Sequence, residues 1–62
     1  MKILVIKDGK KYFLSESEKK KAPKLTQDSK LALTFENLAR AQAIRDDVLE
    51  YYPGSMIVGY PS

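Results

Sequence analysis

Residues 2–14 read KILVIKDGKKYFL, and this stretch decides the fold of the 62-residue chain. Two runs of large apolar side chains flank Asp8-Gly9. That dipeptide favours a type I′ hairpin turn, in which both central residues need positive φ. We therefore predict two antiparallel strands, Lys2 to Lys7 and Lys11 to Ser15, joined by this turn.

The first strand is apolar on both faces. Side chains alternate along a strand, so Ile3 and Val5 point to one face and Leu4 and Ile6 to the other. In the second strand Phe13 lies on the face opposite to its two apolar neighbours. We expect the first strand to occupy the centre of a sheet.

The middle of the chain predicts a loop and a third strand. Residues 15–24 contain no large apolar side chain and are expected to form a solvated connection. Lys30 to Phe35 alternates, with Leu31, Leu33 and Phe35 on one face, which indicates a half-buried strand. The beginning of a helix is the alternative for this segment.

A helix and a last strand follow. Asn37 is the expected N-cap, with Thr34 as an alternative, and Pro53-Gly54 is expected to end the helix, with glycine in the reversed backbone conformation. Apolar residues recur at steps of three and four along it. The predicted stripe consists of Leu38, Ala41, Ile44, Val48 and Tyr51 or Tyr52.

Ser55 to Tyr60 is the last strand, with Met56, Val58 and Tyr60 on one face. The chain is thus predicted to be a single α+β domain over residues 1–62, ordered β-β-β-α-β, with a small three- to four-stranded sheet and one helix packed on one face.

One helix covers only one face of a sheet. Either Ile3 with Val5 or Leu4 with Ile6 packs under it, and the other pair lies on an apolar face that this chain has no second helix to cover. Such a face on a monomer marks an association surface. We predict a non-enzymatic protein-interaction module that forms a homodimer or binds a protein partner. The interface candidates are Ile3, Leu4, Val5, Ile6, Phe13 and Tyr60.

Charge is unevenly distributed along the chain. In residues 1–24 eight lysines oppose three carboxylates, giving +5, and in residues 25–62 three cations oppose five carboxylates, giving −2; together they make the net +3. Lysines neutralise phosphates and aromatic rings stack on bases, so a small nucleic-acid-binding protein is the alternative prediction. Its candidate residues are Lys10, Lys11, Tyr12, Lys19, Lys20, Lys21 and Lys24. Glu16 and Glu18 within the same segment favour an ordinary solvated surface instead.

Several classes of chemistry lack their usual residues. The chain has no cysteine and no histidine, which excludes disulfides, thiolate zinc sites and an ordinary catalytic triad. Asp46 and Asp47 diverge by about 100° on a helix and cannot act on one proton or metal ion. Asp46 with Glu50 lacks a third ligand. We expect no catalytic residue, metal, cofactor or small-molecule substrate. With no apolar run of bilayer length and no signal peptide at its start, the chain is expected to be cytoplasmic.

The stretch from Leu25 to Ala41 resembles a pattern found in very small, mostly uncharacterised phage and prophage proteins. In these an opening hairpin is followed by Thr-x-Asp, a Lys-x-Ala-x-x-Phe strand and a helix with alanines at its start. The matching residues are Thr26, Asp28, Lys30, Ala32 and Phe35. The insertion from Lys19 to Lys24 is longer than the pattern. The resemblance implies a compact accessory protein that binds a host or phage macromolecule, and it assigns no functional residues.

Overall fold

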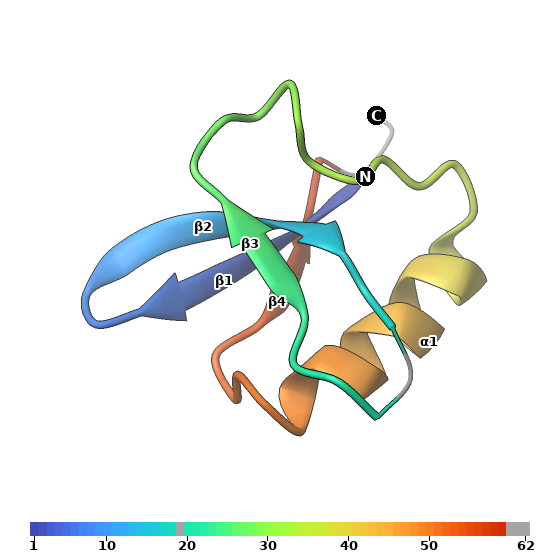
Figure 1. Cartoon of the computed structure of the whole chain (residues 1–62). Coiled ribbons are helices and arrows are strands. Elements are labelled where there is room, and N and C mark those ends of the chain that lie inside the picture. The colour runs from blue at the N-terminus through green and yellow to red at the C-terminus, as the bar shows by residue number, and fades with distance from the viewer. Residues whose placement is uncertain (19, 60–62) are drawn as a thin grey trace.

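The computed structural model describes residues 1–18 and 20–59 (Figure 1). The elements are β1 (Lys2–Lys7), β2 (Lys10–Glu16), β3 (Lys24–Thr26), α1 (Leu38–Leu49) and β4 (Met56–Val58). The strands form one antiparallel sheet in the order β3-β2-β1-β4. The predicted α+β class and the β-β-β-α-β order are confirmed, and β1 is a central strand as expected.

The hairpin forms as the sequence predicts. Asp8 and Gly9 have φ values of 53° and 77°, the left-handed conformation that the turn needs. The register then pairs Lys7 with Lys10, Val5 with Tyr12 and Leu4 with Phe13. The tip of the hairpin projects away from α1 (Figure 1).

The third strand is not where the alternation predicted it. It spans Lys24–Thr26, at the end of the predicted loop, and residues 30–35 form no strand. Asp28 is the reason. Its backbone N–H donates to Thr26 Oγ1 at 3.1 Å, and its Oδ1 accepts from the Lys30 N–H at 2.9 Å. These local bonds turn the backbone, and they use the amides that a sheet ladder would need.

Residues 33–35 instead cross the end of the sheet. The Leu33 N–H donates to Leu14 O at 2.9 Å, and the Phe35 N–H donates to Met1 O at 2.7 Å. The Met1 amino group returns a bond to Phe35 O at 2.9 Å. Leu31, Leu33 and Phe35 were predicted to share the buried face of a strand. Only Phe35 is buried, whereas Leu31 is 65% exposed.

The helix begins at its predicted cap. Asn37 Oδ1 accepts from the backbone N–H groups of Ala39 and Arg40, at 2.8 and 3.3 Å. Ala41 and Val48 are buried, and Ile44 and Tyr52 pack against them from partly buried positions. Two members of the predicted stripe, Leu38 and Tyr51, are about 40% exposed.

The helix ends before the predicted proline and glycine. Leu49 is its last residue, and the N–H groups of Tyr51 and Tyr52 both donate to Val48 O. Because this turn already ends the helix, Gly54 does not take the reversed conformation predicted for it. Ser55 is buried, with its Oγ donating to Tyr52 O at 2.6 Å, and so leads the chain into β4.

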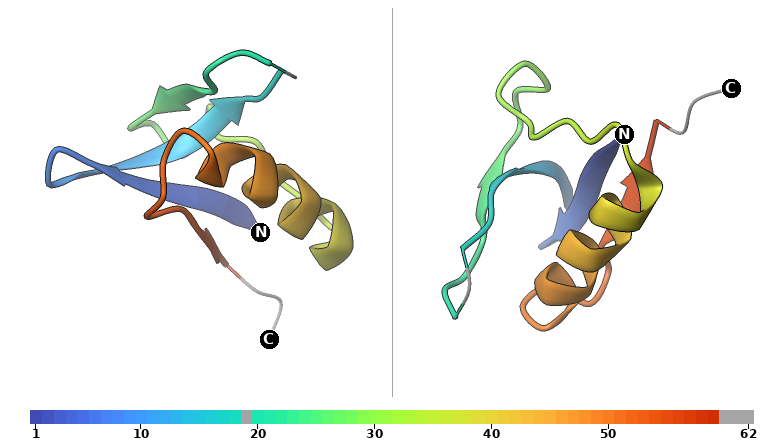
Figure 2. Two further views of the ribbon diagram at one scale, coloured as in Figure 1. Left: turned by 90° about the horizontal axis from the view of Figure 1, so that it is seen from below. Right: turned by 90° about the vertical axis from the view of Figure 1, so that its right-hand side faces the viewer.

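The core lies between the helix and one face of the sheet. Within it α1 packs against β1 and β4, as both views in Figure 2 show. The buried residues of this core are Ile3, Val5, Leu14, Phe35, Ala41, Val48 and Ile57. The last strand is shorter than predicted, and Tyr60 lies outside the described residues.

Candidate protein-interaction surface

The register decides which face of β1 is covered. Ile3 and Val5 are fully buried, so they lie under α1. Leu4 is partly exposed and Ile6 is 43% exposed, on the opposite face. The sequence left open which of these two pairs packs under the helix, and the structure shows that it is Ile3 with Val5. Ile3 and Val5 are therefore core residues and are unavailable to a partner.

The opposite face of the sheet presents a contiguous apolar surface, which we call the open face. Leu4 lies between Phe13 of β2 and Met56 of β4. Ile6 and Val58 are each two residues along their strands from these positions and so point to the same side. The open face comprises Leu4, Ile6, Phe13, Met56 and Val58. No helix in the part of the chain that the structure describes packs against it (Figure 2).

Met56 and Val58 were not among the predicted interface residues. Met56 is 50% exposed, which makes it the most exposed side chain of the open face. Their alternation along the last strand was visible in the sequence. What the sequence lacked was the strand order, which places β4 beside β1 rather than at the edge next to β3.

Lysines share this side of the sheet. Lys2 Nζ lies 5.6 Å from the centre of the Phe13 ring and donates to Ser29 O at 3.2 Å. Lys11 lies directly opposite Ile6 in the ladder. Lys24 is also on this side, at the corner where its Nζ lies 3.1 Å from Glu16 Oε2. The open face is thus apolar in its middle and basic at its margins.

The predicted nucleic-acid residues do not converge. Lys10 and Tyr12 point to the helix side of the sheet, because Tyr12 pairs with the buried Val5. Lys11 points to the open face. Two of the remaining lysines are paired with acids: Lys24 as above, and Lys21, whose Nζ lies 3.3 Å from Glu18 Oε2. Lys19 lies outside the described residues.

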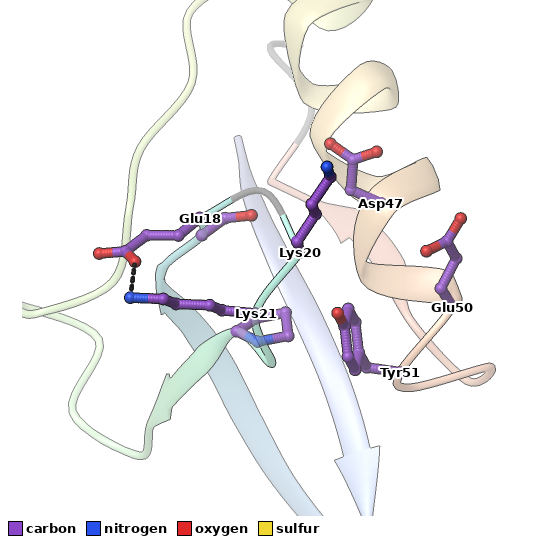
Figure 3. Close-up of a pocket in the computed structure, with 8 residues that line it drawn as sticks. Glu18, Lys20, Lys21, Asp47, Glu50 and Tyr51 are labelled. Atoms are coloured by element: carbon purple, nitrogen blue, oxygen red, sulfur yellow. Dashed lines mark ion pairs between the residues drawn. The ribbon is translucent and has the colours of Figure 1, made fainter.

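Residues 17–18 and 20–23, which we call the lysine loop, run beside the C-terminal end of α1. Pro23 is buried, and a hollow of about 250 Å³ separates the loop from the helix. Figure 3 shows Lys20 on the loop side and Asp47, Glu50 and Tyr51 on the helix side. Acids face bases across this hollow, and within the described residues no group of three or more acidic side chains could hold a metal ion.

The fold and this surface define a class: a small α+β protein whose one helix leaves an apolar, lysine-bearing sheet face uncovered. Comparison of the chain with protein-family models, with curated proteins and with solved structures finds no match. Within the described residues no helix has the length and apolar character needed to cross a bilayer.

Proposed function

We propose that this chain is a non-enzymatic protein-interaction module that binds a protein partner through the open face. The observation that supports the proposal is the side-by-side arrangement of Leu4, Phe13 and Met56 across three strands, extended by two further aliphatic side chains. Burying exposed apolar surface stabilises an interface by about 25 cal/mol per Å² before the costs of association are subtracted. Ile6 and Met56, both about half exposed, have the most surface left to bury.

Two further parts of the proposal rest on the sequence. The lack of histidine and cysteine supports a role without catalysis. The resemblance to very small phage and prophage proteins supports a compact accessory protein. The partner is then a host or phage protein, or a second copy of the chain.

The test compares two double variants of equal charge. Ile6→Lys with Met56→Lys places two cations in the middle of the open face, at positions exposed enough to tolerate them. Ala39→Lys with Ala43→Lys adds the same charge on exposed positions of α1. Each variant and the wild type are checked for folding by circular dichroism and for self-association by sedimentation, and are then used to capture proteins from the native host.

We expect the wild type and the helix variant, Ala39→Lys with Ala43→Lys, to bind a protein partner or to dimerise. The open-face variant, Ile6→Lys with Met56→Lys, should lose this association. Equal capture by all three proteins, with no self-association that depends on the open face, would contradict the proposal.

A further inference from the structure

The charges around the open face restrict what can bind there. Lys2 and Lys11 point to this side, and Lys24 is balanced by Glu16 at the corner. Asp28 stands in the loop beside Lys2, where its Oδ1 already accepts from the Lys30 backbone. The face therefore carries net positive charge next to its apolar middle.

Half of the eight carboxylates lie on the helix side of the molecule. Asp46, Asp47 and Glu50 belong to α1 and its C-terminal turn, and Glu18 pairs with Lys21 on the loop beside the helix. Arg40 and Arg45 of α1, together with the lysines of the loop and of the helix side of the hairpin, offset these carboxylates, so the helix side is not acidic as a whole. What favours the open face for an acidic partner is therefore the local position of Lys2 and Lys11 beside its apolar middle.

From this arrangement we infer that the occupant of the open face is a polypeptide segment whose apolar side chains are flanked by carboxylates. This rests on the proposed function and specifies the chemistry of the partner. The apolar side chains bury Leu4, Ile6 and Met56, and the carboxylates meet the ammonium groups of Lys2 and Lys11.

A symmetric dimer through the open face fits the charges less well. In such an interface the same patch meets itself, so a carboxylate that meets Lys2 or Lys11 must come from the same face of the second copy. The carboxylates described beside this face, Glu16 and Asp28, already pair with Lys24 and with the Lys30 backbone. Like charges placed together at an interface cost free energy, whereas carboxylates at those positions gain it.

Nucleic acid also fits less well. Binding of single strands relies on several exposed rings on which bases stack. Tyr12 and Phe13 are neighbours in β2 and point to opposite faces, so among the described residues Phe13 supplies the one ring of the open face, and the ammonium group of Lys2 already lies over it. The rest of the face is aliphatic.

The geometry also favours a segment laid across the face over one added to a sheet edge. The edge strands β3 and β4 have three residues each, too few for a long ladder of main-chain hydrogen bonds. Four strands spaced about 4.8 Å apart make a face that roughly five extended residues can cross.

The test is a selection from a displayed library of random peptides of about 12 residues, long enough to cross the face with flanking residues. The targets are the wild type, Lys2→Gln with Lys11→Gln, and Lys7→Gln with Lys10→Gln. The third target removes the same charge from the helix side of the hairpin. Ile6→Lys with Met56→Lys serves as the background.

We expect the wild type to enrich peptides that combine large apolar residues with Asp or Glu. Replacing the acids of an enriched peptide by Gln or Asn should weaken its binding, measured by fluorescence anisotropy, about three- to tenfold, as two partly exposed ion pairs allow. The Lys2/Lys11 variant should bind both forms equally, and the Lys7/Lys10 variant should keep the difference.

The alternative outcomes separate the two proposals. Enriched peptides that are apolar without an excess of acids, and that do not bind the open-face variant, would overturn this inference and leave the proposed function in place. No enrichment over the open-face variant would overturn both. Displacement of a bound peptide by an oligothymidylate, with NMR shifts at Leu4, Ile6 and Phe13, would overturn the inference in favour of nucleic acid.

Discussion

Two isoleucines on one strand allow a direct test of the two-sided sheet. Ile3→Ala and Ile6→Ala remove the same atoms from β1, but Ile3 is fully buried under α1 and Ile6 is 43% exposed on the open face. Truncating a buried isoleucine to alanine costs about 2–5 kcal/mol, because it removes apolar contacts and leaves a cavity. Ile6 already has nearly half of its surface in water, so its truncation should cost about 1 kcal/mol, including the lower strand propensity of alanine.

These losses are large compared with the stability of so small a domain. A chain of this length is expected to have about 3–9 kcal/mol of unfolding free energy. At about 4–8 °C for each kcal/mol, Ile6→Ala should lower the melting temperature by about 4–8 °C and Ile3→Ala by about 10 °C or more. Thermal and urea denaturation followed by circular dichroism measures both changes.

The result that would refute this reasoning is an equal loss of stability in the two variants, in samples that sedimentation shows to be monomeric. Equal losses would mean that Ile6 is as buried within the single chain as Ile3. The open face, and the proposals that depend on it, would then be withdrawn.

Three further substitutions test local features. Asn37→Ala should cost about 1 kcal/mol in urea denaturation, because it removes the side-chain oxygen that caps α1, whereas Asn37→Ser should stay close to the wild type. Gly9→Ala should cost about 1–2 kcal/mol, because alanine is strained at φ 77° although its Cβ would meet no atom within 4 Å; Asp8→Asn, which tolerates positive φ, is the control. Lys24→Gln should change stability by less than about 0.5 kcal/mol, since its pair with Glu16 is exposed, and a larger loss that disappears at high salt would contradict this.

The features that the sequence predicted well depend on local chemistry. The turn at Asp8-Gly9 needs only two residues that accept positive φ, and the helix needs a cap at Asn37 and an apolar stripe. Both can be read from a few neighbouring residues. The alternation of β1 likewise indicated two apolar faces correctly, although it could not say which one the helix covers.

The misplaced third strand shows the limit of such patterns. Residues 30–35 alternate like a strand, yet the bonds between Asp28, Lys30 and Leu31 turn the chain. Lys24–Thr26 pairs with β2 although it offers only Leu25 as a large apolar residue. Its place depends on the edge of β2 that is left free once β1 has paired, which is information distant in the sequence. The same holds for Met56 and Val58, whose role on the open face depends on the strand order.

The pairing of β1 with β4 has a consequence for folding. It joins Lys2 to Val58, nearly the full length of the described chain apart, while the β1–β2 hairpin pairs near neighbours. Hairpins form within microseconds, whereas contacts between distant residues must first overcome the entropy of closing a long loop. A nascent chain therefore presents β1 with one paired edge and one bare edge until its last strand has been synthesised. Because a bare apolar edge invites pairing with other chains, the interval before β4 closes the sheet is when this protein is most prone to aggregate.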